Sequence, residues 1–147
     1  MRRVLLLAMV AAAAISLSAQ FAQPEIPAYH PAPPAKDAKL PPILSGFDLA
    51  GPGFRNAFQS HAYVLAAKIS NVIYQQPCYC RCDRSVGHTS LHSCFESTHA
   101  ANCSACMKEA FYAYQMTKQK KTPAQIREGI IRGDWEKIDL ETATAIN

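Results

Sequence analysis

The sequence lacks the features of a membrane-anchored or sheet-forming protein. No cysteine occurs before Cys78, so we expect no lipid on a cysteine near the start of the mature chain. The apolar run over residues 4–17 is shorter than the ~20 residues that span a bilayer. No segment alternates strictly between apolar and polar residues, and no internal repeat is visible. We therefore expect no stable membrane anchor and no β-sheet.

The chain also has little excess charge and no common nucleophile motif. Its formal net charge is +4, to which Arg2 and Arg3 contribute, and such a small excess does not favour a nucleic-acid partner. Serines lie near the histidines, but no Gly-x-Ser-x-Gly turn accompanies them. The sequence gives hydrolase chemistry no support, and it favours a binding protein over an enzyme.

Composition divides the chain into four parts. Residues 1–22 have a basic start, an apolar run and small residues, which predicts a signal peptide and a periplasmic or secreted protein. Residues 23–50 are rich in proline, which predicts an extended, flexible linker with His30 exposed to solvent. A Cys/His-rich domain is predicted over residues 51–135, followed by a C-terminal tail over 136–147.

Apolar spacing predicts a mainly α fold, a small domain of about three to four helices with a Cys-rich loop. Apolar residues at three- and four-residue steps predict a helix over about 54–74, with His61 as a packed core histidine. A second helical pattern, which can be interrupted, runs over 89–120. The sequence Thr-Pro-Ala-Gln at 122–125 is typical of a helix start, and we expect that helix to end near Gly133.

The densest chemical signal lies between Pro77 and Cys106, where nine of thirty residues are cysteine or histidine. Thiolates and imidazoles bind zinc and copper(I), whereas calcium and magnesium prefer oxygen ligands. Zinc takes four ligands, and the nine cysteines and histidines exceed that number. They therefore fit either a multinuclear copper(I) site or a zinc site with spare residues. The candidate metal ligands are Cys78, Cys80, Cys82, Cys94, Cys103, Cys106, His88, His92 and His99.

The spacing of these residues suggests how they meet. Cys78, Cys80 and Cys82 alternate, so in an extended segment their sulfurs would point the same way. His99, Cys103 and Cys106 would form one stripe on a continuous helix, and His92, one heptad earlier, would extend it. On the same helix, we expect Glu109 to be solvated. The pattern predicts a protein that sequesters, buffers or transfers copper or zinc, with a metal donor or acceptor protein as its partner.

Two alternatives remain open. Six cysteines in an exported domain can form three disulfides, in fifteen possible connectivities, which would make this a disulfide-stabilised interaction domain. Cys103 and Cys106 form a Cys-x-x-Cys pair, which near a helix start is typical of a thiol-disulfide oxidoreductase. Attachment of haem c is excluded because Met107, not histidine, follows the pair.

The cysteine pattern resembles that of the PCYCGC-motif family, a group of exported bacterial proteins that are often lipoproteins. The resemblance spans roughly residues 60–132 and implies an exported setting and a small helical domain, but it supplies no reaction. Arg81 stands where the motif has glycine, which argues against a turn that needs a positive φ. The matching residues are Pro77 to Cys82, Gly87 to Leu91, Cys94, Phe95, His99, Cys103, Cys106, Glu109 and Ala110.

Overall fold

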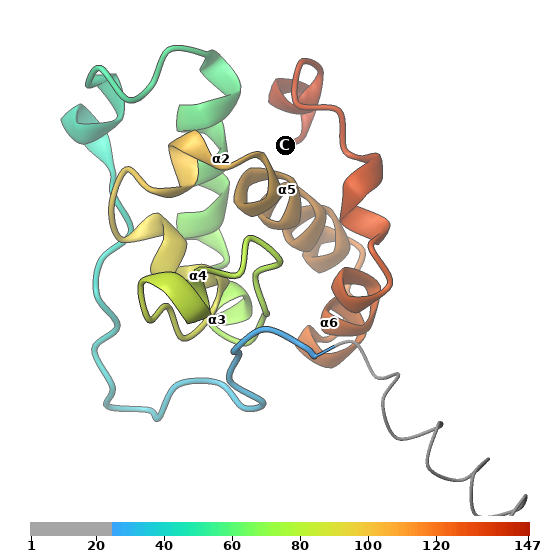
Figure 1. Cartoon of the computed structure of the whole chain (residues 1–147). Helices are drawn as coiled ribbons and strands as arrows, with labels where there is room; N and C mark the ends of the chain where they lie inside the picture. The colour runs from blue at the N-terminus through green and yellow to red at the C-terminus, as the bar shows by residue number, and fades with distance from the viewer. Residues whose placement is uncertain (1–24) are drawn as a thin grey trace, which may run out of the picture.

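The computed structural model describes residues 25–147 and contains five α-helices and no strand among them (Figure 1). This confirms the predicted mainly α fold, in which three helices exceed one turn. The predicted signal peptide, residues 1–22, lies outside the described residues. In chain order the elements are η2 (Gly46–Ala50), α2 (Ala57–Lys68), α3 (Ser70–Ile73), α4 (Cys82–Ser85), η3 (Leu91–Phe95), η4 (Ala100–Asn102), α5 (Ser104–Lys118), α6 (Pro123–Ile131), η5 (Asp134–Lys137) and η6 (Ala143–Ala145).

Helix α2 and helix α3 together fill the region predicted as one helix. Helix α2 begins after Asn56, whose backbone N–H donates to Gln59 Oε1 at 2.8 Å, a capping arrangement that satisfies an otherwise unpaired backbone donor. The helical path breaks at Ile69, where φ is −124°. The predicted helix over 54–74 is therefore confirmed in position, but it consists of two segments.

Helix α5 lies at the centre of the molecule and contacts α2, α3 and α6 (Figure 1). Its side chains from Ala110 to Ala113 are buried, including Phe111, which is fully inaccessible. Helix α6 starts as predicted: Thr122 Oγ1 accepts from the Gln125 backbone, and the Gln125 side chain accepts from the Thr122 backbone. Apolar burial around α5 supplies the rigid support for the cysteine-bearing segments.

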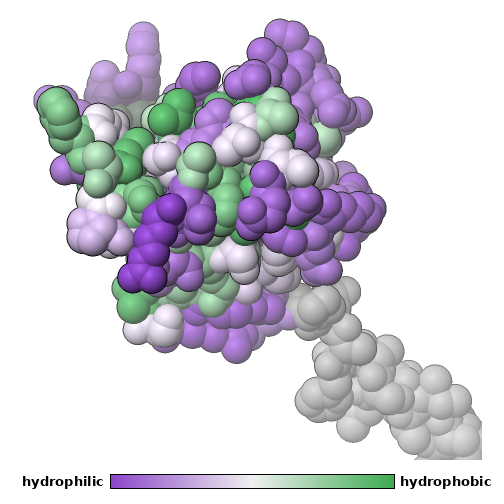
Figure 2. Space-filling model, turned by 90° about the horizontal axis from the view of Figure 1, so that it is seen from above, coloured by the Kyte–Doolittle hydropathy of each residue, from purple (hydrophilic) through white to green (hydrophobic). Residues whose placement is uncertain are grey.

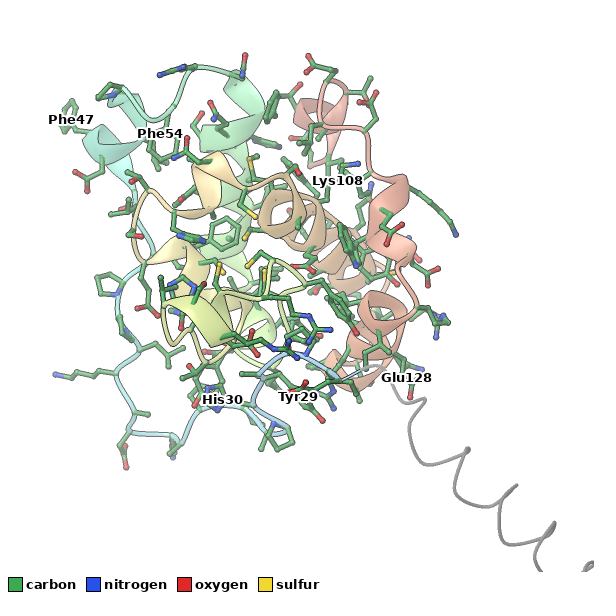
Figure 3. The ribbon with its side chains drawn as sticks, viewed as in Figure 1. Tyr29, His30, Phe47, Phe54, Lys108 and Glu128 are labelled. Atoms are coloured by element: carbon green, nitrogen blue, oxygen red, sulfur yellow. The ribbon has the colours of Figure 1, made fainter. Side chains whose placement is uncertain are left out.

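The proline-rich segment packs against the domain, so the prediction that it would not pack is wrong at several positions. Pro27 is fully buried. The ring of His30 stacks on Tyr74 with centroids 3.9 Å apart, and Arg127 lies over the Tyr29 ring. Figure 3 shows Tyr29 and His30 along the lower edge of the domain, with Tyr29 on the side of α6. Apolar and aromatic contacts thus outweigh the preference of a proline-rich chain for solvated extension.

The C-terminal segment also returns to the domain. Ala143, in η6, is buried, and η6 contacts α2. His61 Nε2 donates to the Ile146 carbonyl at 2.7 Å, and the His61 ring lies beside Phe111. The interpretation of His61 as a packed core histidine agrees with these contacts.

The surface alternates between hydrophilic areas and smaller hydrophobic ones (Figure 2). Among the described large apolar residues, Phe47 is the most exposed, with 99% of its surface accessible. Among residues 25–147, none of the helices has the length and apolar character needed to cross a bilayer.

Candidate metal centre

The loop that carries Cys78, Cys80 and Cys82 is a compact turn, not the extended segment that the alternation suggested. The Arg81 backbone N–H donates to the Cys78 carbonyl at 3.2 Å, and Arg81 adopts φ 61° and ψ 27°. Arg81 stands at the position of the motif's glycine and adopts the left-handed conformation that glycine favours. The expectation that the arginine argues against a turn with positive φ is therefore wrong. The turn brings the three sulfurs together: Sγ of Cys80 lies 3.1 Å from that of Cys78 and 3.0 Å from that of Cys82.

Helix α2 holds the segment that carries His99. The Tyr63 hydroxyl donates to the Ser97 carbonyl at 2.7 Å and accepts from the Ala101 backbone at 3.1 Å. The Gln59 side-chain amide donates to the Ala101 carbonyl at 2.6 Å. Tyr63 and Gln59 are both buried, so these bonds are shielded from water and fix the backbone on both sides of His99.

The stripe predicted for His99, Cys103 and Cys106 does not form, because the helix is not continuous there. Cys103 has extended φ and ψ of −128° and 107° and caps the N-terminus of α5, where its sulfur accepts from the Cys106 backbone at 3.5 Å. His99 precedes the short segment η4. Cys106 stands in the first turn of α5, where the helix dipole favours negative charge.

Four cysteines form a buried group that we call the thiol pocket. Its members are Cys78, Cys80, Cys94 and Cys106, whose sulfurs all lie within 4.8 Å of one another. Sγ of Cys78 is 3.4 Å from that of Cys106. Cys94 and Cys106 are fully inaccessible, Cys78 is 6% exposed and Cys80 is half-buried. The pocket thus combines thiols from the loop, from η3 and from α5. Figure 3 shows sulfur atoms gathered at the centre of the molecule beside α5.

A second group, which we call the rim site, shares one cysteine with the thiol pocket. It consists of Cys80, Cys82 and His99, whose donor atoms also lie within 4.8 Å of one another. Nε2 of His99 is 2.9 Å from Sγ of Cys82. Cys80 and His99 are half-buried, so the rim site is more accessible than most of the thiol pocket.

The other three candidate ligands lie outside both groups. Cys103 caps α5 and is half-buried. His88 Nδ1 is 3.3 Å from Sγ of Cys94, and its ring lies 4.9 Å from that of His99. His92 is buried and pairs through Nδ1 with Glu96 at 2.9 Å, while its Nε2 has no partner. A ligand role for these three residues remains a prediction.

The thiols differ in acidity because they hydrogen-bond to one another. Bonds from the thiols of Cys103 and Cys106 lower the pKa of Cys80 from 9.0 to about 6. Hydrogen bonding with Cys103 and the neighbouring thiols, together with burial, raises the pKa of Cys106. The lowered pKa favours the thiolate form of Cys80, the member common to both groups. Metal ions bind the thiolate form, so Cys80 is prepared to bind near neutral pH.

Glu109 is buried, contrary to the expectation of a solvated residue. It is fully inaccessible, and its Oε1 accepts from the Tyr79 backbone at 2.8 Å, inside the cysteine loop. Its Oε2 has no partner. Desolvation raises the pKa of Glu109 from 4.5 to about 8. The residue lies three positions after Cys106, on the same side of α5, and that spacing was the available signal for its place beside the thiols.

The donor set fits a soft metal ion. Two sulfurs that each lie ~2.3 Å from one zinc ion are ~3.8 Å apart in a regular tetrahedron and at most ~4.6 Å apart. The sulfur separations of 3.0 to 3.4 Å given above need only small adjustments to meet that geometry. All six cysteines are free thiols in the structure. The residues can therefore surround an ion of the zinc or copper(I) type.

Comparison with known proteins supports the family resemblance that the cysteine pattern indicated. A family model described as protein of unknown function with PCYCGC motif matches residues 55–137, more than half of the chain. The chain belongs to this family. The predicted PCYCGC membership is thereby confirmed, and the motif coincides with the turn that carries three of the thiols. No curated protein and no solved structure matches the chain.

Proposed function

We propose that this PCYCGC-family protein binds soft metal ions, copper(I) or zinc, through its clustered thiols and His99. The observation that carries the proposal is the thiol pocket: four sulfurs from three separate elements lie within 4.8 Å of one another. Such convergence costs conformational entropy and brings polarisable, ionisable groups together in a buried space. Clustered thiolates repel one another, and a bound cation offsets that repulsion. The clustering of the thiols therefore supports a metal-binding function.

The structure suggests what each part would do. Cys78, Cys94 and Cys106 would hold an ion away from water, whereas Cys80 and His99 are half-buried and stand nearer the surface. The Glu109 carboxyl group would keep the loop in place by accepting from the Tyr79 backbone N–H. Metal binding displaces protons from thiols, so affinity should rise with pH. We further propose that the protein is periplasmic or secreted and that it sequesters, buffers or hands over its ion to another protein.

The test is metal analysis of the reduced full-length protein, purified anaerobically, after titration with zinc and separately with copper(I). We expect tight, stoichiometric binding that competes with a chelator. Cys94→Ser should weaken binding strongly because it removes a thiolate from the thiol pocket. His99→Gln should weaken it less. The matched control is His30→Gln, a half-buried histidine outside both groups that stacks on Tyr74, and it should bind metal as the unaltered protein does.

Two results would overturn this proposal. The first is failure of the reduced, folded protein to retain either metal, with folding checked by circular dichroism. The second is isolation from the periplasm with no titratable thiol, which would instead support the disulfide-stabilised domain. Disulfide-reductase activity that depends on Cys103 and Cys106, in protein that binds no metal, would favour the oxidoreductase.

A further inference from the structure

The thiol pocket and the rim site overlap in a single residue, Cys80. Its sulfur lies 3.1 Å from that of Cys78, in the thiol pocket, and 3.0 Å from that of Cys82, in the rim site. No single group of mutually close donors includes both Cys82 and the whole thiol pocket. Because two sulfurs on one zinc ion are at most ~4.6 Å apart, one ion cannot bind the donors of both groups.

We propose that the protein holds two metal ions and that the sulfur of Cys80 bridges them; this rests on the proposed metal binding. One ion takes the four sulfurs of the thiol pocket. The other takes Cys80, Cys82 and Nε2 of His99. A thiolate has several lone pairs and can bind two soft cations at once, and Cys80 is the one donor that both groups contain.

Charge favours the second ion. A zinc ion with four thiolates carries two net negative charges, and leaving them in a largely buried site is costly. Adding a second zinc ion, one more thiolate and a neutral imidazole reduces the net charge to one negative. Cys82 is itself buried, at 8% exposure, and its sulfur is 2.9 Å from His99. In the two-ion arrangement, Cys82 and His99 both bind the rim ion.

The two ions have different surroundings and therefore different roles. The thiol pocket supplies four ligands and closes the coordination of its ion, as in structural zinc sites. The rim site supplies three protein ligands and leaves a fourth position open, as in sites that take an additional ligand. Cys80 and His99 are half-buried, so an incoming thiol or imidazole from another protein can reach that position. The pocket ion stabilises the fold, and the rim ion is the one that exchanges.

The Pro27 segment limits access on one side of the two groups. Pro27 and Ala28 line a narrow space together with Cys78, Cys82 and His88. The Ala28 backbone donates to Asp83 Oδ2 at 3.1 Å, which fastens this segment to α4. Exchange of the rim ion therefore occurs past Cys80 and His99, the half-buried members of the rim site, and not through the narrow space that Pro27 lines.

The test is a zinc titration of the reduced full-length protein, with the bound ions counted by native mass spectrometry. We expect two zinc ions in the unaltered protein and one in Cys82→Ser and in His99→Gln, because only the rim site is altered. Cys103→Ser tests the assigned ligand sets, because it removes a thiol outside both groups while a hydroxyl still caps α5, and it should keep two ions. The control is His30→Gln, a histidine outside both groups that stacks on Tyr74, and it should also keep two ions. Circular dichroism checks that each variant is folded.

Two further measurements test the bridge and the difference between the sites. Loading with the spin-half isotope of cadmium should give two NMR signals, split by coupling through the shared sulfur. In a chelator challenge, one zinc ion should leave well before the other, and His99→Gln should lack the fast phase.

The outcomes separate the two proposals. One zinc ion in the unaltered protein, or two uncoupled cadmium signals, would overturn the bridge while metal binding stands. No bound zinc with copper(I) retained would also overturn this inference alone. No metal of either kind would overturn the proposed function itself. Loss of an ion from Cys103→Ser would contradict the assigned ligand sets.

Discussion

The α5–α6 region and the cysteine-bearing region, residues 78–106, are built in different ways. The first consists of regular helices with a standard cap at Thr122 and a continuous apolar contact that includes Phe111 and Ile130. The second consists of the one-turn helix α4, the 3-10 segments η3 and η4, the turns between them and the first turn of α5, and its buried side chains include four thiols.

The difference shows what stabilises each region. Helices α5 and α6 combine regular backbone hydrogen bonds with apolar packing, since they place Phe111, Ile126 and Ile130 in the hydrophobic core. In the cysteine-bearing region, short elements have few backbone hydrogen bonds of their own, and its shape depends on contacts with α2 and α5. Bound metal should therefore stabilise residues 78–106 much more than it stabilises α6.

Metal loading should give the largest effect. When free zinc exceeds its dissociation constant ~1,000-fold, linkage predicts about 4 kcal/mol of added stability. Hydrogen exchange should slow most over residues 78–106, because the ions link segments that lack regular structure. Exchange of α6 at native conditions should change least. Equal protection of both regions would show that the contrast drawn here is wrong.

Glu109 should make the metal-free protein less stable as pH rises. Its pKa is raised in the folded state to about 8 from 4.5, so the folded protein binds the proton more tightly than the unfolded chain. The stability that this proton provides is complete below pH 4.5 and is lost as pH rises towards 8, at about 1.4 kcal/mol for each pH unit.

The Glu109→Gln variant isolates that contribution. Denaturant unfolding with reductant present, compared at several pH values, should show a smaller fall in stability for the variant than for the unaltered protein. The amide can still accept from the Tyr79 backbone, so the cysteine loop should keep its shape. Parallel pH dependences for the two proteins would contradict the buried, proton-binding role of this carboxyl.

Gly129→Ala should destabilise the α5–α6 contact. A Cβ at this position would overlap the Tyr112 hydroxyl and lie 2.8 Å from its Cζ. Such overpacking costs about 1–3 kcal/mol, partly offset by ~1 kcal/mol from better helix propensity. Thermal unfolding should therefore show a net loss of stability with the zinc count unchanged. Gly53→Ala is the control, because a Cβ there makes only ordinary contact with Thr98, and it should leave the midpoint nearly unchanged.

Thr122→Ala should give the smallest effect. It removes the side-chain acceptor for the Gln125 backbone at the start of α6, which costs about 1 kcal/mol. The exposed Thr144 provides the comparison, since its replacement by alanine removes no side-chain hydrogen bond seen in the structure. Chemical denaturation measures both variants. A change in metal affinity for Thr122→Ala would mean that the two regions are more strongly coupled than we infer.

Much of the helical region could be predicted from the sequence, because its signals are local. The start of α6 depends on residues within one turn, and the apolar stripe of α2 follows from periodicity. The break at Ile69 and the packing of Pro27 could not be predicted in this way. Both depend on which distant surfaces are available for contact, and composition alone favoured a solvated linker for Pro27.

For the candidate site too, residue types could be predicted from the sequence but their spatial arrangement could not. The types and density of its donors predicted clusters that could hold a metal ion, which the structure shows, but the spacing arguments failed for the cysteine loop and for the stripe at His99. Arg81 adopts a conformation that glycine prefers, and Cys103 leaves the helix in order to cap it. In both cases the tertiary contacts of the turn outweigh the local preference of the residue.

By itself, the sequence determined the helical class, the family and the set of residues able to bind a soft metal, because these depend on residue type and short-range pattern. Only the tertiary structure decided that Cys80 belongs to two groups, that Glu109 is buried beside the loop and that Cys103 lies outside both groups. Those relations join residues up to about thirty positions apart. Long-range placement of this kind is set by packing against α2 and α5, which no local pattern encodes.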